Sequence, residues 1–441
     1  MSLSIAIIGS GPAGFYTADA LTSACPDCRV DFIERLPTPF GLIRGGVAPD
    51  HQTTKRVTKK YENTAMMEQV NFYGNVEIGR DLSLDELRTM YDAVVLAIGA
   101  PADKKLTIPG ADKIGVHGSA AFVGWYNGHP DFRDLEPDLN TNAAVVIGNG
   151  NVAIDVARVL LRSPDGMADS DLPDHVASRI HAAPITDVHV VGRRGPADAK
   201  FTNVELREMG NLNMTHPCVK ADQLPDDLDT VLAGYAERDR RLRARNIETL
   251  REFAALENQG KPKKVHFEFF ATPVEIMGGE RVEAIRFERT TVEDGKCLGS
   301  GQFFDIECGL VIPSIGYRSE PLAGAPFDDK QGIIPNDNGR IAPGLYAVGW
   351  IKRGPSGVIS SNRPDGNIVA EYIAEDITAD PKRTGRDRLE AVLKERHVRW
   401  VDYADWKKLE AMEIENAAGK APRKKFVTVD DMIHALDGFP N

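Results

Sequence analysis

The sequence predicts an α/β protein in which two units of the same kind, each built on a mainly parallel sheet, are nested in one chain. A glycine-rich turn follows an apolar strand and opens a helical pattern over residues 4–21, and the same arrangement returns over residues 143–161. After residue 320 the chain returns to the glycine-rich style of the first unit. The second unit is therefore expected to be an insertion into the first.

The first turn follows the apolar run 5–8 and has the G-x-G-x-x-G spacing of a Rossmann-like dinucleotide-binding domain. Gly9 permits the tight turn, Gly11 lets the backbone approach a pyrophosphate, and Gly14 lets helix and strand pack closely. Glu34 ends the next strand 20 residues after Gly14, where an acid accepts hydrogen bonds from ribose hydroxyls. We therefore predict FAD here; the alternative is a glycine-rich turn that binds nothing.

The second turn has Gly148, Gly150 and Ala153 in G-x-G-x-x-A form behind another apolar strand. The strand after it runs into Arg193 and Arg194, and paired arginines at that place suit a ribose phosphate. Because 40 residues separate Ala153 from Arg193, more than usual, we expect an elongated helix and loop in between. The pattern predicts NADPH at this turn, and the alternative is a solvated basic turn.

Length and composition fit two Rossmann-like domains, since 441 residues with 42% hydrophobic content exceed what one core normally serves. We predict an FAD-binding domain made of residues 1–105 and 321–441, including a C-terminal extension, and an inserted NADP-binding domain of residues 106–320.

A net charge of −12 argues against a general nucleic-acid binder, and no apolar run reaches the 18 residues of a membrane span. The first strand begins within five residues of Met1, leaving no room for a signal peptide. We expect a cytoplasmic protein, or the mature form of an imported one.

The five cysteines do not predict a disulfide framework in a chain of this length. Cys25 and Cys28 form a C-P-D-C pair, which leaves a redox role open, although they lie at the end of the first helix in what is usually an ordinary loop. Cys218, Cys297 and Cys308 are isolated, so no second close pair completes a zinc or iron–sulfur site. We predict no metal.

Seven strings of the sequence, in order, resemble the adrenodoxin reductase family, the NADPH:ferredoxin oxidoreductases of the flavoprotein class with two dinucleotide-binding domains. They are GSGPAGFYTA, ERLPTPFGLIRGGVAPDH, VGWYNGHPD, GNGNVAIDVAR, VGRRGP, FTNVELRE and GWIKRGPSGVI. The resemblance implies FAD, NADPH and a ferredoxin partner, which can feed a cytochrome P450 or another oxygenase. Two departures, SSNRPDG after the last string and PDHQ in place of PDHP, leave the identity of the ferredoxin open.

The resemblance also implies which residues contact each cofactor. The family's FAD contacts fall on Ala13, Glu34, Leu42, Ile78, Trp350, Gly357, Val358 and Ile359. Its NADP contacts fall on Asn149, Gly150, Asn151, Val152, Arg193, Arg194, Glu205 and Gly357, and on Lys104, where a relative has arginine. Trp350 offers a flat apolar surface with one N–H donor, and the alternative for it is core packing.

The expected chemistry passes a hydride from NADPH to FAD and then single electrons to the ferredoxin, while the protein supplies orientation and electrostatics. No side chain is obligatory for hydride transfer. His51 and Glu208 are therefore candidates for proton relay or nicotinamide placement, and a structural role for the histidine is equally compatible. Glu205 is a candidate for ordering the arginine pair.

Docking of an acidic ferredoxin on an enzyme of net negative charge requires a local basic patch. The densest candidate patch is Arg238, Arg240, Arg241, Arg243 and Arg245, and a second consists of Lys55, Arg56, Lys59 and Lys60. The alternative for both is a solvated helix face.

Three other functions stay open at this stage. A thioredoxin-reductase-like disulfide enzyme would need its dithiol on the NADP domain, and a glutamate-synthase-type electron-input subunit would need clustered cysteines. A non-enzymatic scaffold that merely holds FAD would not be reduced by NADPH.

Overall fold

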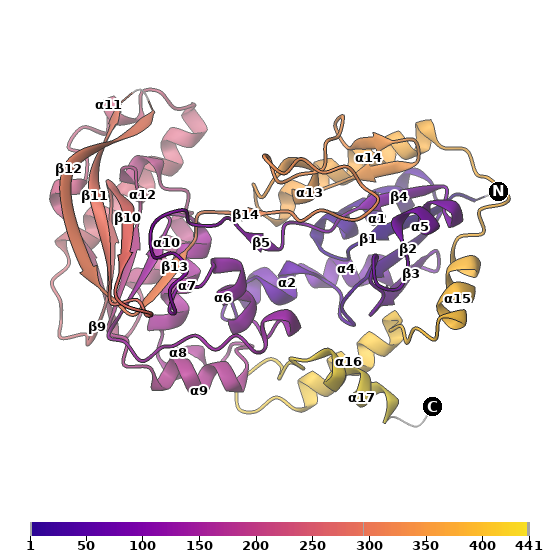
Figure 1. Cartoon of the computed structure of the whole chain (residues 1–441), viewed down its shortest axis with the longest axis horizontal. Coiled ribbons are helices and arrows are strands. Elements are labelled where there is room, and N and C mark those ends of the chain that lie inside the picture. Colours follow the sequence, from indigo (N-terminus) through magenta and orange to yellow (C-terminus); the bar gives the residue numbers. More distant parts are fainter. Residues whose placement is uncertain (1, 294, 439–441) are drawn as a thin grey trace. The chain divides into compact units, whose positions relative to one another are not determined.

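The computed structural model describes residues 2–293 and 295–438, which form two compact units. Unit 1 comprises Met1–Ala102, Asn127–Arg133 and Tyr317–Asn441, and unit 2 comprises Asp103–Tyr126 and Asp134–Gly316. The short strands β5 (Ala102–Asp103) and β14 (Tyr317–Arg318) lie where the chain passes from one unit to the other. Each unit has its own sheet and its own helices (Figure 1).

Unit 1 is built on a six-stranded sheet in the order β15-β16-β4-β1-β2-β3. All neighbouring strands pair in parallel except β15 and β16, which are antiparallel. The bounds are β1 Ser4–Ile8, β2 Arg29–Glu34, β3 Val70–Gly74, β4 Ala93–Leu96, β15 Arg340–Ala342 and β16 Leu345–Ala347. Every residue of β1 is buried, as expected for a central parallel strand covered on both faces.

Successive residues of β1 point to opposite faces of this sheet and enter different cores. Ile5 and Ile7 pack in a cluster with residues of α1 and α14, whereas Ala6 and Ile8 pack with residues of α5 and α15. The helices are α1 Pro12–Ala24, α2 Leu42–Gly45, α3 Gln52–Lys55, α4 Thr58–Ala65, α5 Leu84–Met90, α13 Trp350–Arg353, α14 Asn362–Asp376, α15 Arg386–Glu395, α16 Tyr403–Glu415 and α17 Val429–Asp437. Trp406 and Leu409 of α16 join the first of these cores, so the C-terminal region belongs to the packed body of unit 1.

The segment Asn127–Arg133 belongs to unit 1. The sequence predicted instead that all of residues 106–320 form the NADP-binding domain. Three side-chain contacts explain this difference. Arg35 pairs with Asp131, the Lys425 ammonium donates to the Asn127 carbonyl at 3.0 Å, and His129 lies against Gly45. All three partners are distant in sequence, so the composition of the segment gives no sign of its place.

Unit 2 is built on a five-stranded parallel sheet in the order β13-β6-β7-β9-β8. Its strands are β6 Ala143–Ile147, β7 Asp187–Val191, β8 Thr215–Val219, β9 Lys263–Glu268 and β13 Leu310–Pro313. An antiparallel meander of β10 (Ala271–Met277), β11 (Ala284–Glu293) and β12 (Lys296–Glu307) packs Ile276, Ile285 and Phe287 against Val145 and Val191 of the main sheet. The meander therefore covers part of one face.

The helices α7 (Asn151–Leu161), α10 (Asn203–Gly210) and α12 (Glu237–Ala255) contact strands of the five-stranded sheet. The expected long connection between Ala153 and Arg193 consists of the rest of α7 and two further helices, α8 (Pro164–Met167) and α9 (Asp174–Ala182). The remaining helices of unit 2 are α6 (Ser119–Tyr126) and α11 (Leu228–Leu232).

Candidate functional site

The first glycine turn, between β1 and α1, has the geometry that its spacing predicts. Gly9 has φ +99°, and a Cβ on it would lie 2.6 Å from the Ala97 carbonyl oxygen. A Cβ on Gly14 would collide with the Gly9 carbonyl oxygen, so only glycine lets α1 pack this closely on the turn. At Gly11, the residue that caps α1, a Cβ would meet only the Gly41 Cα, at 3.9 Å. The helix N-terminus therefore keeps open space for a pyrophosphate.

Glu34, at the end of β2, holds the first turn in place. One carboxylate oxygen accepts from the Ser10 backbone N–H at 3.0 Å and from the Ser10 hydroxyl at 2.8 Å. The other accepts from the Leu36 N–H at 3.1 Å. Because each carboxylate oxygen can accept more than one hydrogen bond, the oriented group still has acceptor sites for ribose hydroxyls.

A second loop, around Phe40 and Gly41, reaches the same turn. Phe40 has φ +83°, and its N–H donates to the Ser10 carbonyl at 3.0 Å. A Cβ on Gly41, where φ is +48°, would lie 2.9 Å from the Gly11 Cα. Leu42, a predicted FAD contact, follows directly and is 42% exposed. Glycine is needed at position 41 because φ is positive there and a side chain would meet Gly11.

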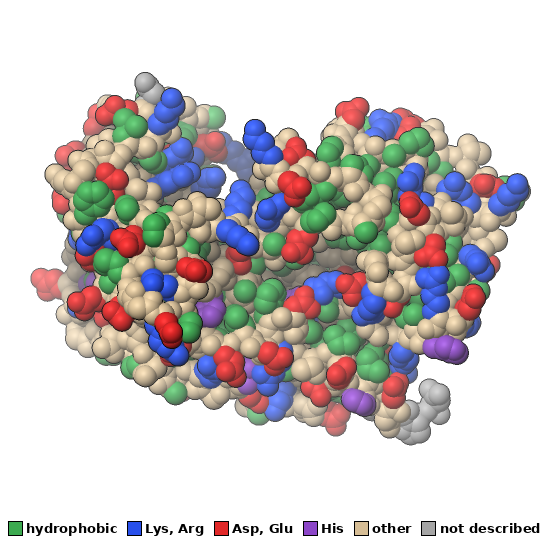
Figure 2. All heavy atoms as spheres, viewed as in Figure 1, with side chains coloured by type: hydrophobic (Ala, Val, Ile, Leu, Met, Phe, Trp, Pro, Cys, Tyr) green, Lys and Arg blue, Asp and Glu red, His purple; other side chains and the backbone are tan. Residues whose placement is uncertain are grey.

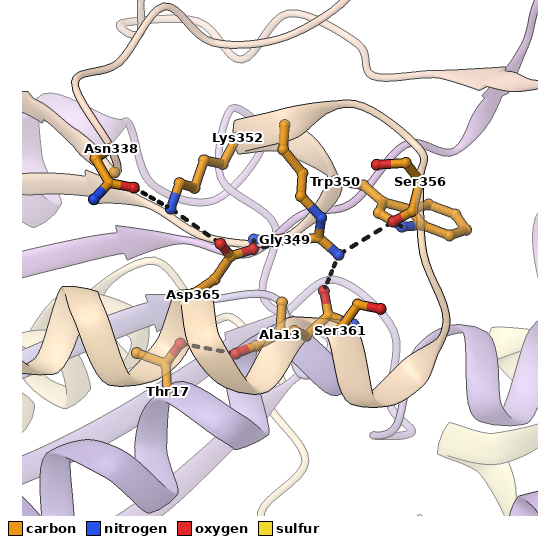
Figure 3. A network of polar contacts seen from close by, with 12 residues as sticks. Ala13, Thr17, Asn338, Gly349, Trp350, Lys352, Ser356, Ser361 and Asp365 are labelled. Atoms are coloured by element: carbon orange, nitrogen blue, oxygen red, sulfur yellow. Dashed lines mark hydrogen bonds and ion pairs between the residues drawn. The ribbon is translucent and has the colours of Figure 1, made fainter. Parts of the chain in front are cut away.

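A buried network ties the glycine-rich segment 349–357 to α14 (Figure 3). Asp365 of α14 accepts from the Lys352 ammonium at 3.0 Å and from the Gly349 N–H at 3.1 Å, and it pairs with Arg353. Gly349 has φ +73°, and a Cβ there would lie 2.6 Å from the Ala13 Cβ. The network thus places this segment against the start of α1, beside the first glycine turn.

Trp350 and Arg353 also fix the loop that follows α13. The Trp350 indole N–H donates to the Ser356 carbonyl at 3.2 Å, and Arg353 donates to the same carbonyl at 3.3 Å (Figure 3). The Trp350 ring is half-buried and packs on Tyr317, with ring centroids 5.9 Å apart, so it is not a core residue. Val358, a predicted FAD contact, is 58% exposed, and its N–H donates to the Ser361 hydroxyl at 3.0 Å.

The other predicted residues of unit 1 have separate places. Gly357 has φ +85°, and a Cβ on it would lie 2.5 Å from the Ser361 hydroxyl. Ile359 opens a short 3₁₀ turn, and its carbonyl accepts from the Asn362 side chain at 2.9 Å. Ile78, which follows β3, forms an isolated bridge with Leu82 and is half-buried. His51 caps α3 and is also half-buried.

The second glycine turn, between β6 and α7, is open where a nucleotide would bind. Gly148 has φ +145°, and a Cβ on it would collide with the Ser314 carbonyl oxygen. A Cβ on Gly150, the N-cap of α7, would meet no atom within 4 Å, so the backbone at the helix start is accessible. Ala153 is fully buried, as its packing role predicts. The Asn151 side chain accepts from the Thr202 N–H at 2.7 Å and fixes the adjoining loop.

Three other predicted NADP contacts lie on unit 2. Asn149 lies over Gly192, its carbonyl accepts from the Lys200 N–H at 2.7 Å, and its buried side-chain oxygen has no hydrogen-bond partner among the described residues. Val152, in the first turn of α7, is half-buried. Lys104 is exposed, with its N–H bonded to the Gly316 carbonyl at 3.0 Å.

Arg193 and Arg194 directly follow β7, as the spacing predicts. The Arg193 side chain is exposed and forms no ion pair with any residue that the structure describes. Arg194 is more constrained: it donates to the Gly295 carbonyl at 2.9 Å and lies 3.8 Å from the Asp198 carboxylate. The Arg194 Nε is buried and has no acceptor among the described residues. Two guanidinium groups with unused donors suit a phosphate.

The role of Glu205 in ordering the arginine pair stays a prediction. Its ion-pair partner within unit 2 is Arg158 of α7, at 3.4 Å, and Glu208 lies 3.5 Å from the same guanidinium. Arg158 is 1% exposed and also pairs with Asp155 at 2.8 Å. A buried arginine needs carboxylates around it, and Glu205 is one of those that surround Arg158.

Comparisons with known proteins bear on this arrangement. A family model described as pyridine nucleotide-disulphide oxidoreductase matches residues 3–195. The chain is 40% identical to the mitochondrial NADPH:adrenodoxin oxidoreductase of Arabidopsis thaliana, over 98% of this chain and 95% of the relative. It is also 40% identical to the NADPH-ferredoxin reductase FprA of Mycobacterium tuberculosis, over 97% and 98%. The structure of that FprA in complex with NADPH matches with a TM-score of 0.94 at 38% identity, covering 99% of this chain and all of the other.

The chain belongs to the adrenodoxin reductase family. The resemblance inferred from the seven strings and the α/β fold class with two Rossmann-like domains are therefore confirmed. The residue assignments within each unit stay predictions, because they concern contacts with cofactors. No helix among the described residues is long and apolar enough to cross a membrane.

The surroundings of Cys28 do not favour the thiolate that a redox-active dithiol needs. Burial, together with the neighbouring Cys25, raises the pKa of the Cys28 thiol to about 11. Both cysteines are free; Cys25 directly follows α1, and Cys28 lies between α1 and β2. The burial of Cys28 therefore weighs against a disulfide enzyme.

In each predicted docking patch, only some of the basic side chains are exposed to a partner. In α12, Arg238, Arg241 and Arg245 are exposed, and Arg241 pairs with Glu237 at 2.8 Å. Arg243 instead donates to the Ala197 carbonyl and stacks on Tyr235. Arg240 is half-buried, so Arg240 and Arg243 are poor candidates for partner contact. In the second patch, Lys55 is only 9% exposed and Lys60 pairs with Asp19 at 2.8 Å, leaving Arg56 and Lys59 exposed.

Proposed function

We propose that this protein is an FAD-dependent NADPH:ferredoxin oxidoreductase, with FAD held by unit 1 and NADPH by unit 2. The observation that carries the proposal is the contrast between the two turns: a carboxylate, Glu34, stands beside the first, and two cations, Arg193 and Arg194, stand beside the second. When bound, FAD accepts a hydride from NADPH and releases electrons one at a time. Family membership supports the same assignment.

In unit 1, the open N-terminus of α1 takes the FAD pyrophosphate, because a Cβ at Gly11 would approach only Gly41. Glu34 accepts from the adenosine ribose. The segment from Trp350 to Ile359, fixed by Arg353 and Asp365, presents backbone N–H groups and the Trp350 ring toward the flavin. Ala13, Leu42 and Ile78 supply further contacts.

In unit 2, the start of α7 takes the NADPH pyrophosphate beside Gly150, with Asn149, Asn151 and Val152 around it. Arg193 and Arg194 hold the 2′-phosphate, and Lys104 adds positive charge. Glu205 and Glu208 are held through Arg158 and support the nucleotide side of the unit. His51 and Glu208 keep their proposed roles in proton relay or nicotinamide placement.

The test is the nucleotide preference of the Arg193→Ala/Arg194→Ala variant. Two guanidinium groups on one phosphate contribute on the order of 2–4 kcal/mol of discrimination, roughly 30- to 1,000-fold. KM for NADPH is expected to rise by that factor while turnover with NADH stays nearly unchanged. Arg281→Ala, which removes an exposed arginine of unit 2, is the matched control. Equal losses with both nucleotides would show that the pair is structural.

We propose that the electron acceptor is a ferredoxin that supplies a cytochrome P450 or another oxygenase, in the cytoplasm, where five free cysteines are compatible with reducing conditions. Acidic and basic side chains are interspersed over the face shown in Figure 2, so docking requires a local cluster of one sign. Arg238, Arg241 and Arg245 form the candidate.

Reversing the charge of Arg241 and Arg245 is expected to slow ferredoxin reduction and to flatten its dependence on ionic strength. Reduction of ferricyanide, which needs no docked protein, should stay close to wild type. Unchanged ferredoxin turnover would place the docking surface elsewhere. Anaerobic NADPH should also bleach the flavin, which a non-enzymatic scaffold would not allow.

A further inference from the structure

We infer that the end of the β11–β12 hairpin is a positioning element for 2′-phosphate recognition, acting on Arg193 and Arg194 through Thr290 and Gly295. The inference rests on the proposed NADPH function of the arginine pair. Thr290 lies 97 residues from Arg193 in sequence, yet its hydroxyl donates to the Arg193 carbonyl at 2.7 Å. This contact lies entirely within unit 2.

The pairing of β11 with β12 is irregular beside Thr290. Glu288 pairs with Phe303 across the hairpin, but the next pair is Thr290 with Gly299, so the single residue Arg289 lies opposite residues 300–302 of β12. The Glu288 carboxylate accepts from the Gly301 N–H at 2.9 Å, and a Cβ on Gly299 would collide with that carboxylate. The part of the hairpin beyond this irregularity contains Thr290 and Cys297, which reach the Arg193 carbonyl.

Thr290 is well placed to fix the backbone at Arg193. It is 7% exposed, and its own N–H donates to the Phe270 carbonyl at 2.9 Å, which anchors it to the start of the meander. The Cys297 thiol lies 3.5 Å from the same Arg193 carbonyl. Two side chains of the hairpin therefore bond one carbonyl, at the residue whose guanidinium stays exposed.

Arg194 is held by the tip of the same hairpin. Its guanidinium donates to the Gly295 carbonyl at 2.9 Å, and the Asp198 carboxylate lies 3.8 Å away. Its Nε is buried without an acceptor among the described residues, so at least one donor is held in a fixed direction and left unused. An orphaned buried donor of this kind is expected where a ligand supplies the missing acceptor.

The β11–β12 hairpin is not needed to hold the backbone on either side of Arg193, because two other backbone hydrogen bonds already do so. The Ala271 N–H already donates to the Gly192 carbonyl at 3.0 Å, and the Phe270 N–H donates to the Arg194 carbonyl at 3.2 Å. These backbone bonds flank Arg193 on both sides, and the Arg193 carbonyl between them depends on Thr290 and Cys297. The loss of Thr290 should therefore alter the orientation of the arginines more than the stability of the unit.

The test compares Thr290→Val, Thr290→Ser and Thr291→Val in the FAD-loaded protein, by calorimetric titration with NADP⁺ and with NAD⁺. Valine keeps the shape of threonine and removes the hydroxyl, serine restores the donor, and Thr291 is the exposed neighbour on β11. Thr290→Val is expected to raise Kd for NADP⁺ about 3- to 10-fold, the effect of one neutral hydrogen bond, with Kd for NAD⁺ and kcat unchanged. The other two variants should bind both nucleotides like wild type.

The same substitution in an Arg193→Ala/Arg194→Ala background separates this inference from the proposed function. There Thr290→Val should have no further effect on NADP⁺, because the groups that it positions are absent. Equal weakening of NADP⁺ and NAD⁺ by Thr290→Val, or no weakening at all, overturns the positioning role alone. If the double arginine variant itself keeps its preference for NADP⁺, the proposed role of the pair is wrong and the inference is overturned with it.

Discussion

Replacing Asp365 by asparagine is expected to loosen unit 1 more than removing a cation from the same network. Asp365 is 8% exposed and accepts from Lys352, Arg353 and the Gly349 N–H. Asparagine keeps the size of the side chain but leaves the two cations without their anion. Removing one partner of a buried pair so that a charge stays uncompensated costs about 3–5 kcal/mol.

Lys352→Met is the matched comparison. Lys352 is 9% exposed, and methionine retains an unbranched apolar stem of similar length. Asp365 keeps Arg353 and the Gly349 N–H as partners, so no buried charge is left alone. The cost should therefore be about 1–2 kcal/mol, because the hydrogen bonds to Asp365 and to the Asn338 side-chain oxygen, at 3.2 Å, are both lost.

The assay is urea unfolding of the FAD-loaded proteins, followed by the release of flavin fluorescence. With a denaturant slope of about 3 kcal/mol per molar urea, Asp365→Asn should lower the midpoint by about 1 M or more, and Lys352→Met by about 0.3–0.7 M. Both variants should unfold in the same number of steps as wild type. Equal shifts for the two variants, or a shift of Asp365→Asn below about 0.3 M, would refute the reasoning from uncompensated charge.

Two further predictions concern the glycine turns and pH. Gly150→Ala is expected to leave the urea midpoint unchanged and to weaken NADP⁺ binding in a calorimetric titration. Gly148→Ala should instead destabilise unit 2, because its Cβ would collide with the Ser314 carbonyl. A Gly150→Ala variant that binds NADP⁺ tightly would contradict the assignment of this turn. Burial lowers the pKa of His129 to about 4, so the unfolded chain takes up a proton that the folded chain does not. The free energy of unfolding should thus be at its full value above pH 6.5 and fall by up to about 3 kcal/mol as the pH drops from 6.5 to 4. His129→Gln should flatten that dependence in urea titrations at each pH, and an unchanged slope would show that other groups cause it.

The two glycine turns could be predicted from sequence because each depends on residues close together in the chain. Glycine spacing, an apolar strand before it and a charged residue at the next strand end are all local patterns. The structure places Gly9, Gly14 and Gly148 where any Cβ would meet a carbonyl oxygen, so the pattern has a steric cause.

The supports of those turns could not be predicted, because their partners are distant in sequence. Nothing local marks Gly41 as the neighbour of Gly11, or Thr290 as the partner of Arg193. Glu205 shows the same limit: it follows the basic turn closely in sequence, yet it pairs with Arg158. A buried arginine requires its carboxylates, and burial is a property of the tertiary fold.

The two turns have different supports because the side chains that we propose to read each ribose have opposite hydrogen-bond chemistry. A carboxylate only accepts, and a glycine turn at a helix start exposes N–H groups, so Glu34 is oriented by Ser10 of its own turn, at 3.0 Å and 2.8 Å. A guanidinium only donates, and Arg194 takes its acceptor from Gly295, 101 residues along the chain. The meander of unit 2 thus brings a carbonyl oxygen to the end of β7, which a carboxylate at that place could not use. We therefore expect that an acid in place of Arg194 does not by itself invert the nucleotide preference, because it would face that carbonyl with no donor between them.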